Sequence, residues 1–260
     1  MVEERQAALK QMIPHKVTGS DDVAVGLWKS QCWRSADRLT RFFNQIVGEK
    51  RVPSDWQQST TISIWKRKGS PADRANYRPN RLLSHTMKVS EHFIDRRIRN
   101  IMRLSTNQSG FVAGCGTIVA IHAARLLVEK HREKQKPLHL AFLDLGKAFN
   151  RVPHKVIWYA FRQQGVPEEL IEWIRIRYSS LRSHVQAAAG TSADFPISVS
   201  VREGSALSPL LFIVVMDVVT WDLQKITWTL LYADDAHLRR QAKTRAADTK
   251  LESPACKVQC

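Results

Sequence analysis

Cysteine is scarce in this sequence, and its placement excludes two common kinds of small domain. The 260 residues contain four cysteines, and the two that lie close together form a Cys-x-x-x-Cys pair at the extreme end with no histidine nearby. That pattern is neither a disulfide framework nor the ligand spacing of a zinc site. We therefore expect reduced, intracellular thiols and no zinc.

Long hydrophobic runs are also missing. The most apolar run covers residues 210–216 and is bounded by Pro209 and Asp217. A helix needs about 20 apolar residues to cross a bilayer, so this run is too short. The first residues are charged and carry no apolar signal segment. We expect no membrane association.

Acidic residues are few compared with basic ones. There are 24 Asp+Glu against 40 Lys+Arg, which gives a formal net charge of +16 and a pI near 10.1. A surplus of this size usually indicates a polyanionic partner, most often nucleic acid; a basic protein with no particular partner is the alternative. The hydrophobic fraction of 43% is enough to build a core for one large domain or two small ones.

Periodicity predicts a mixed helical and strand organisation. Apolar residues recur at helical spacing through much of the first 52 residues, and β-branched residues alternate at 60–65. Further helices are expected at 84–102, 117–134, 153–164, 168–181 and 207–223, and further strands at 138–144, 184–189 and 195–201. Residues 241–260 are polar and aperiodic, which predicts a disordered tail.

Two adjacent aspartates near the end give the strongest chemical signal. Asp234 and Asp235 follow an apolar run, and alternation resumes after them, which predicts a strand, a tight turn and a strand with both carboxylates at the tip. Taken alone, a solvated turn explains them. However, Asp144 also ends an apolar, strand-like run. Three carboxylates at the ends of neighbouring strands could hold two magnesium ions for phosphoryl transfer.

Other residues could complete a nucleotide site. Phe149 lies five positions after Asp144, where a tight turn would make its ring a floor beneath the sugar and exclude a 2′-hydroxyl; an ordinary core phenylalanine is the alternative. Basic clusters at 66–68 and 78–81 flank a predicted hairpin and could bind a triphosphate, or could be solvated surface. Gly204 would allow a backbone to approach a ligand closely.

Together these motifs resemble the reverse transcriptase domain of non-LTR (LINE-type) retrotransposons, and RTE-like elements most of all. The similarity runs from about residue 15 to residue 238. It is carried by Trp-Lys-Arg-Lys-Gly at 65–69, Asn-Tyr-Arg-Pro at 76–79, Leu-Leu-Ser at 82–84, Asn-Gln-Ser-Gly-Phe at 107–111, Ala-Phe-Leu-Asp at 141–144, Lys-Ala-Phe at 147–149, Gly-Ser-Ala-Leu-Ser-Pro at 204–209 and Tyr-Ala-Asp-Asp at 232–235.

The resemblance implies an α+β fold shaped as a right hand, with an antiparallel palm sheet backed by helices. It divides the chain into a helical N-terminal extension at 1–52, fingers at 53–137, a palm at 138–240 and an unrelated tail at 241–260. Because the similarity stops after the Tyr-Ala-Asp-Asp motif, we expect the thumb to be missing, along with the endonuclease that usually precedes this domain.

The resemblance also assigns roles to residues. It implies two magnesium ions, an RNA template, a DNA primer, deoxynucleoside triphosphates and a nuclear location. The metal-binding catalytic residues would be Asp144, Asp234 and Asp235. The nucleotide-binding residues would be Lys66, Arg78 and Arg81 for the triphosphate, Phe149 for the sugar, and Glu203 and Gly204. The residues near template and primer would be Gln108, Gly110, Phe111 and Tyr232.

Several positions depart from the family pattern. Gly146 stands where relatives usually carry Glu, Asn150 where they usually carry Asp, and Arg202 and Glu203 replace a His-Gln pair whose Gln contacts the nucleotide. A carboxylate at Glu203 would repel a triphosphate. Two rivals to an active polymerase follow: a catalytically silent, basic RNA-binding remnant, and an RNA-dependent RNA polymerase, which Phe149 disfavours.

Overall fold

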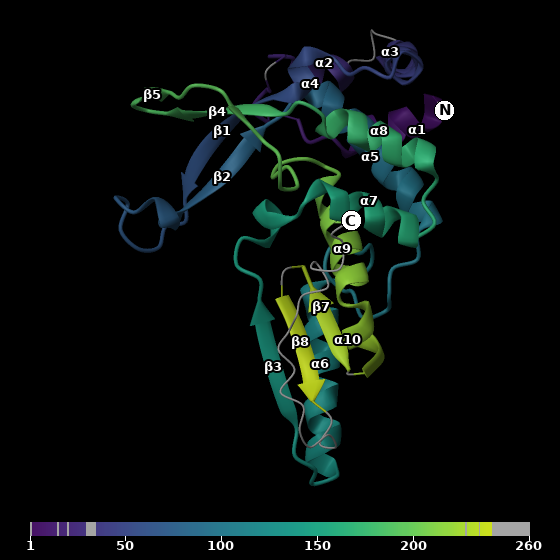
Figure 1. Cartoon of the computed structure of the whole chain (residues 1–260), viewed down its shortest axis with the longest axis vertical. Helices are drawn as coiled ribbons and strands as arrows, with labels where there is room; N and C mark the ends of the chain where they lie inside the picture. Colours follow the sequence, from purple (N-terminus) through teal and green to yellow (C-terminus); the bar gives the residue numbers. More distant parts are fainter. Residues whose placement is uncertain are drawn as a thin grey trace. The chain divides into compact units, whose positions relative to one another are not determined.

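The computed structural model describes residues 2–14, 16–19, 21–29, 35–226, 228–233 and 235–240 (Figure 1). The chain divides into two compact units, and each is taken by itself. Unit 1 comprises Met1–Arg103 and Phe149–Leu211, and unit 2 comprises Leu104–Ala148 and Phe212–Cys260. The units are therefore interleaved in sequence, whereas the fingers and palm were predicted as consecutive segments; those boundaries stay a prediction.

Unit 1 combines helices with a five-stranded sheet. Its helices are α1 (Val2–Gln11), α2 (Val25–Lys29), α3 (Ser35–Glu49), α4 (Ser54–Gln57), α5 (His85–Ile101), α7 (His154–Gln163) and α8 (Glu168–Tyr178). Its strands are β1 (Gln58–Trp65), β2 (Tyr77–Leu82), β4 (Arg182–Ala187), β5 (Gly190–Thr191) and β6 (Phe195–Pro196). The helices predicted at 84–102 and 168–181 are confirmed, with α8 ending three residues early.

The sheet of unit 1 is mixed. Its order is β2-β1-β4-β5, with β6 also pairing with β4; β1 and β2 form the predicted antiparallel hairpin, while β1 and β4 run parallel. The strand predicted at 195–201 is wrong beyond Pro196. Beyond Pro196 the contacts are isolated: Ile197 N–H donates to the Leu181 carbonyl at 2.9 Å, and Val199 forms a single antiparallel bridge with Pro153.

The N-terminal part of unit 1 is organised by the apolar stripe of α3. Leu39, Phe43 and Ile46 recur at helical spacing, and each is at most 6% exposed. The Phe43 ring packs edge-on against Trp56, with ring centroids 6.1 Å apart. Burying such side chains stabilises the fold by about 1.5–3 kcal/mol each, and this confirms the predicted helical stripe.

Unit 2 is built on a three-stranded sheet. The strands β3 (His139–Asp144), β8 (Asp235–Arg240) and β7 (Thr229–Tyr232) lie in that order, and both pairings are antiparallel, as predicted for the palm. Helix α6 (Thr117–Glu133) runs along this sheet and contacts β7. Helix α9 (Ser208–Val219) continues the chain from unit 1 into unit 2 and is followed by α10 (Trp221–Ile226).

The predicted single helix at 207–223 is interrupted. It ends at Val219, and a new helix begins at Trp221. Between them the Thr220 hydroxyl donates a hydrogen bond to the Met216 carbonyl at 2.7 Å. The backbone hydrogen bonds continue across the junction, since Thr220 N–H also donates to the Met216 carbonyl at 3.0 Å, and such back-bonding by a Thr hydroxyl often bends a helix.

Two predictions concern parts or properties beyond these elements. The tail at 241–260 lies outside the described residues. Among the described residues, no helix combines the length and the hydropathy that a membrane span requires.

Candidate active site

The aspartate hairpin forms as predicted, but Asp235 does not lie at its tip. Strand β7 ends at Tyr232 and β8 begins at Asp235, and these two residues are register partners. The turn uses Ala233 at φ +54°, a left-handed conformation typical of tight hairpin turns. Asp234 lies outside the described residues. The expectation that both carboxylates sit at the tip is therefore wrong for Asp235, which is the first residue of a strand.

Asp144 and Asp235 face each other across two strands. They are direct register partners in the antiparallel β3–β8 pair, and both are exposed. Residues opposed in this way have Cβ atoms about 4.5–5.5 Å apart, and like charges so placed destabilise a sheet. A divalent cation between the carboxylates would remove that cost, because carboxylate oxygens are the ligands that magnesium prefers.

The described residues supply part of the predicted metal site. They contain no group of three or more His, Cys, Asp or Glu side chains that could hold a metal ion, and the third predicted ligand, Asp234, is not among them. What the structure does bring together is Asp144 and Asp235, which are 91 positions apart in sequence. The chemistry of this pair fits a hard divalent cation.

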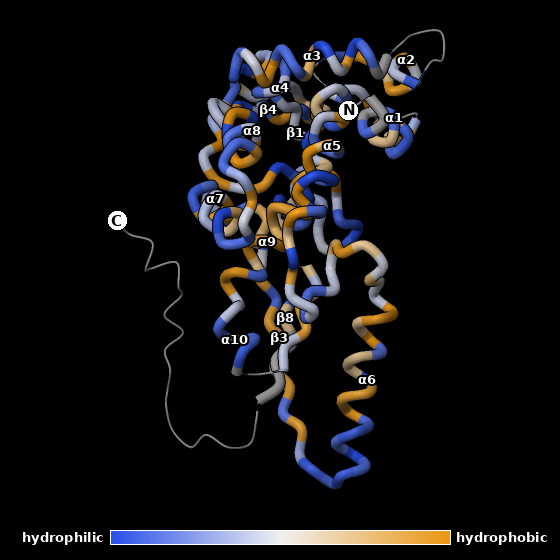
Figure 2. Tube along the Cα trace, turned by 90° about the vertical axis from the view of Figure 1, so that its right-hand side faces the viewer, coloured by the Kyte–Doolittle hydropathy of each residue, from blue (hydrophilic) through white to orange (hydrophobic). Residues whose placement is uncertain are grey.

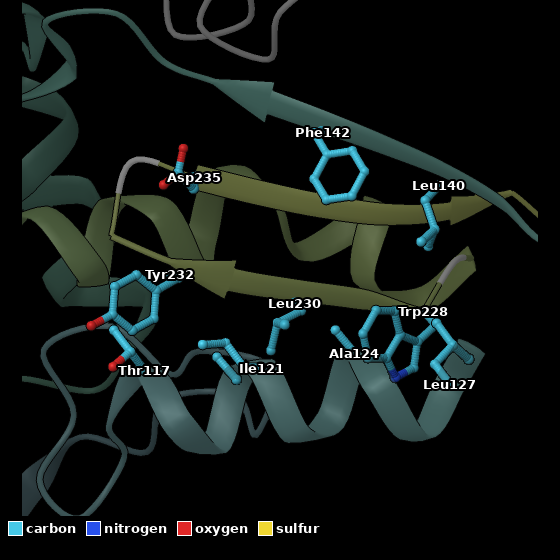
Figure 3. A pocket seen from close by; sticks show the side chains of 11 residues that line it. Thr117, Ile121, Ala124, Leu127, Leu140, Phe142, Trp228, Leu230, Tyr232 and Asp235 are labelled. Carbon is cyan, nitrogen blue, oxygen red and sulfur yellow. The ribbon is translucent and has the colours of Figure 1, made fainter. Parts of the chain in front are cut away.

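The carboxylates lie on the face of the sheet that α6 runs along. Tyr232, Asp235 and Phe142 line a cavity of about 250 Å³ between the sheet and α6 (Figure 3). Asp144 shares the face of Phe142, because alternate residues of a strand point the same way. The opposite face buries Leu231, at 0% exposed, and Ala236, at 5%.

The segment predicted to lie near the template packs against the same hairpin. Ser109 N–H donates to the Leu231 carbonyl at 2.8 Å, and Leu231 N–H donates to the Asn107 carbonyl at 2.9 Å. Gln108 forms an isolated parallel bridge with Leu231 and is 3% exposed. The loop therefore supports β7 directly.

Gly110 is constrained by this contact. A Cβ atom at that position would collide with the backbone nitrogen of Ala233, in the turn of the aspartate hairpin. The Gln108 side-chain amide also donates to the Gly110 carbonyl at 3.2 Å. Phe111 follows at φ +58° and is 45% exposed. Gln108 and Gly110 thus adjoin the hairpin that carries Tyr232, while their contact with a template stays a prediction.

In unit 1, the two cations predicted to bind a triphosphate lie near the turn of the β1–β2 hairpin. Lys66 directly follows β1, and Arg78 pairs with Ile64 across the hairpin; both cations are exposed. The Lys66 ammonium donates to the Ala75 carbonyl at 3.1 Å. The hairpin therefore brings the two predicted basic clusters together at one end.

The third cation, Arg81, belongs to a separate polar cluster that includes Glu203. The Asn150 side-chain amide donates to a Glu203 carboxylate oxygen at 2.9 Å. Burial lowers the pKa of the Arg81 guanidinium, and the Glu203 charge acts in the opposite direction. The negative charge of Glu203 is therefore partly compensated within the chain, which weakens the expected repulsion of a triphosphate.

Gly204 makes a close approach, but to the backbone of Arg81 in this chain and not to a ligand. Its φ is +93°, and a Cβ atom would lie 2.5 Å from the Arg81 carbonyl oxygen. Phe149 lies in a 3-10 turn (Ala148–Arg151), is half-buried, and accepts a hydrogen bond at its carbonyl from Val201 N–H at 2.9 Å. The role of Phe149 as a floor beneath the sugar stays a prediction, beside the alternative of a core phenylalanine.

Sequence reasoning missed a buried charge cluster that holds the 202–206 loop. Arg202 is 3% exposed and donates to the carbonyls of Trp56, at 3.1 Å, and Arg177, at 2.8 Å. Glu91 is 1% exposed and accepts a hydrogen bond from Ala206 N–H at 2.9 Å. Burial lowers the pKa of Arg202 and lowers that of Arg177 to about 10.

One signal in the sequence could have revealed this cluster. Glu91 occupies the apolar stripe of α5, between Met87 and Ile94, and both of those neighbours are at most 1% exposed. A charged residue on a buried stripe needs a buried partner. The loop next to Gly204 is therefore anchored from inside by Glu91 and Arg202.

Comparison with known proteins places the chain in a family. Residues 65–253 match the family model for reverse transcriptase (RNA-dependent DNA polymerase), which is well over half of the chain. The chain therefore belongs to the reverse transcriptase family of RNA-directed DNA polymerases.

The similar curated proteins are non-LTR retrotransposon proteins. The chain is 30% identical over 203 residues to a Pol polyprotein of the R2 element of Nasonia vitripennis, with 78% of this chain and 20% of that protein covered. It is 29% identical to the R2 counterpart of Popillia japonica (85% and 30% covered) and 27% identical to the polymerase of the jockey element of Drosophila melanogaster (81% and 24%). The resemblance is confirmed at this level; the RTE-like subtype stays a prediction.

The chain spans less than a third of the length of these relatives. Among solved structures it is similar to telomerase from Candida albicans in complex with a fragment of telomeric RNA. That match has a TM-score of 0.49 and 10% identity and covers 76% of this chain and 42% of the telomerase chain.

Proposed function

We propose that this chain catalyses RNA-directed DNA synthesis at Asp144 and Asp235, with Asp234 as the third ligand of two magnesium ions. The observation that supports this most is the direct opposition of Asp144 and Asp235 across β3 and β8. Family membership indicates the class of reaction, and the paired carboxylates are the candidate metal-binding site at which it would occur.

The carboxylates and the 107–110 segment have separate roles in this proposal. Bound magnesium would neutralise charge on the attacking and leaving oxygens of the phosphoryl transfer. Asp144 and Asp235 provide oxygen ligands whose positions are fixed by strand pairing rather than by a loop. The 107–110 segment keeps the hairpin in place through its hydrogen bonds to Leu231.

Residues of unit 1 and Tyr232 bind the substrates. Lys66 and Arg78 bind the triphosphate of the incoming deoxynucleotide, with Arg81, Glu203 and Gly204 nearby in sequence or structure. A half-buried Phe149 ring excludes the 2′-hydroxyl, so Phe149→Ala should raise ribonucleotide incorporation relative to deoxynucleotide incorporation. Tyr232 lies near the primer end, and the exposed Phe111 ring lies on the template side. The site of action is nuclear by analogy with the family.

Primer extension tests the proposal. A labelled DNA primer annealed to an RNA template is incubated with the full chain, deoxynucleotides and Mg²⁺. Wild type should extend the primer. The extension rate of Asp144→Asn or Asp235→Asn should fall by more than the roughly 10–100-fold that is typical when a residue that supports a metal ligand is changed. The matched control is Asp222→Asn, whose side chain is 88% exposed on α10; it should keep wild-type activity.

Failure has a clear form in this assay. If folded wild-type protein incorporates no deoxynucleotide, the proposal is overturned. RNA binding without incorporation would then favour the silent remnant, a candidate kept because Glu203 places a carboxylate among the predicted nucleotide residues. A preference for ribonucleotides would favour the RNA-dependent RNA polymerase.

A further inference from the structure

A second groove lies at the far end of α6. Its volume is about 510 Å³, and it is formed by the last turns of α6, the residues leading into β3 and the residue before β7. All of its lining belongs to unit 2. The lining residues are Ala123, Leu126, Leu127, Lys130, His131, Lys134, Lys136 and Trp228. We call it the α6 basic groove.

The lining of the α6 basic groove combines positive charge with an apolar floor. Lys130, Lys134 and Lys136 form no ion pair with any described residue, so their charges are available to a partner. No acidic side chain is among the described residues that line the groove. Figure 2 shows the hydrophobic colour along α6 giving way to hydrophilic blue at the turn into β3.

Helix α6 itself presents this chemistry by its spacing. Leu127, Lys130 and Lys134 recur at intervals of three and four, which places them on one face of the helix. The His131 Nδ1 atom lies 2.8 Å from the Leu127 carbonyl oxygen. Since a carbonyl can only accept, Nδ1 carries the hydrogen, and the ring is held in a fixed orientation.

The groove lies away from the predicted catalytic acids. Trp228 precedes the first residue of β7, whereas Tyr232 ends it; likewise Lys136 precedes β3, whereas Asp144 ends it. A six-residue strand is roughly 20 Å long. In Figure 3, Trp228 and Leu127 lie at one end of the sheet, and Tyr232 and Asp235 at the other.

We propose that the α6 basic groove binds single-stranded RNA as a non-catalytic contact site. Lysine ammonium groups pair with backbone phosphates, and the half-buried Trp228 ring offers a face on which an unpaired base can stack. A basic groove with an aromatic platform is the combination that single strands use. The proposal does not require the chain to be a polymerase.

Salt-dependent binding of a defined oligonucleotide tests the groove. The full chain is titrated against a fluorescein-labelled 20-mer of oligo(U), and the affinity is measured by anisotropy at several salt concentrations. Each phosphate contact contributes about 0.7 to the slope of log K against log salt for single strands. Lys130→Gln/Lys134→Gln should therefore reduce the slope by about 1.4. The control Lys10→Gln/Lys155→Gln removes the same charge from two exposed lysines elsewhere and should leave the slope near the wild-type value.

Stacking is tested separately. Trp228→Leu should weaken binding roughly tenfold without changing the slope, and Trp228→Phe, which keeps an aromatic face, should restore most of the affinity. Circular dichroism checks that each variant is folded. If the lysine double variant and its control have equal slopes, the proposal is overturned. It is also overturned if the wild-type chain binds poly-glutamate of matched charge through these two lysines but does not bind oligo(U), since the groove would then take an acidic polypeptide.

Discussion

The contact between Asn150 and Glu203 makes a quantitative prediction. The resemblance implies Asp and Gln at these two positions, so Asn150 and Glu203 would exchange the amide and the carboxylate between them. In the structure the Asn150 amide donates to the Glu203 carboxylate at 2.9 Å. We therefore expect the two positions to be coupled, so that changing Asn150 alone lowers the free energy of unfolding more than changing both residues does.

The magnitude follows from the geometry. Asn150→Asp replaces a hydrogen bond to a charged group, worth about 1.5–3 kcal/mol, with two carboxylates in contact. Their repulsion is about 4 kcal/mol at 4 Å and an effective dielectric of 20, and the partial exposure of both residues lowers it to about 1–2 kcal/mol. We expect Asn150→Asp to lower the free energy of unfolding by about 2.5–5 kcal/mol.

The double variant is the informative one. In Asn150→Asp/Glu203→Gln the glutamine amide can donate to the new carboxylate, so the unfolding free energy should return to within about 1 kcal/mol of wild type. Glu203→Gln alone should cost about 1 kcal/mol. The cycle then gives a coupling energy of at least about 2.5 kcal/mol, which lies at the upper end of the range for residues in contact.

Urea denaturation of the four proteins measures the cycle. Asn100→Asp, at an exposed position near the end of α5, is the control for a new carboxylate and should cost less than about 1 kcal/mol. If the two single changes add without coupling in the double variant, the side chains do not form this hydrogen bond and the reasoning is refuted.

Three further predictions follow from individual side chains. Gly110→Ala should reduce primer extension, because its Cβ collides with the turn of the aspartate hairpin, whereas Gly146→Ala, with nothing within 4 Å, should be neutral; equal activities would contradict the packing described. Glu91→Gln should lower the unfolding free energy by about 1–3 kcal/mol, because it removes a buried negative charge that favours the charged forms of Arg177 and Arg202 and accepts the Ala206 N–H; an unchanged unfolding free energy in urea denaturation would count against that cluster. Burial lowers the pKa of His154 below its usual 6.5, so its stabilising contribution is complete above pH 6.5 and is lost as the pH falls below it. The stability of His154→Phe, measured from pH 7.5 to 5, should therefore fall less steeply than that of wild type, and parallel curves would refute this.

The sequence predicted local structure better than long-range pairing. The stripe of α3, the β1–β2 hairpin and the end of β3 at Asp144 all follow from periodicity and turn residues. The parallel pairing of β1 with β4 joins residues more than 120 positions apart. The sequence of neither segment predicts which strand it pairs with. The same holds for Arg202, whose burial depends on carbonyls supplied by Trp56 and Arg177.

The candidate site shows the same division. The types and the order of its residues could be predicted from the sequence, because an aspartate at the end of an apolar strand is a local pattern. That these residues lie opposite each other could not be predicted, because strand register decides it. Asp235 faces Asp144 because β8 pairs with β3 in the register that opposes these two residues. For that reason Asp235 begins a strand, directly after the turn, whereas the sequence pattern predicted it at the tip.

Binding of Mn²⁺, followed by electron paramagnetic resonance as a substitute for Mg²⁺, tests the central claim most directly. If Asp144 and Asp235 share a cation across β3 and β8, the full chain should bind Mn²⁺, Asp144→Asn and Asp235→Asn should each lose that binding, and Asp222→Asn should retain it. Binding that survives loss of either carboxylate, or a folded wild-type chain that binds no Mn²⁺, would contradict the account.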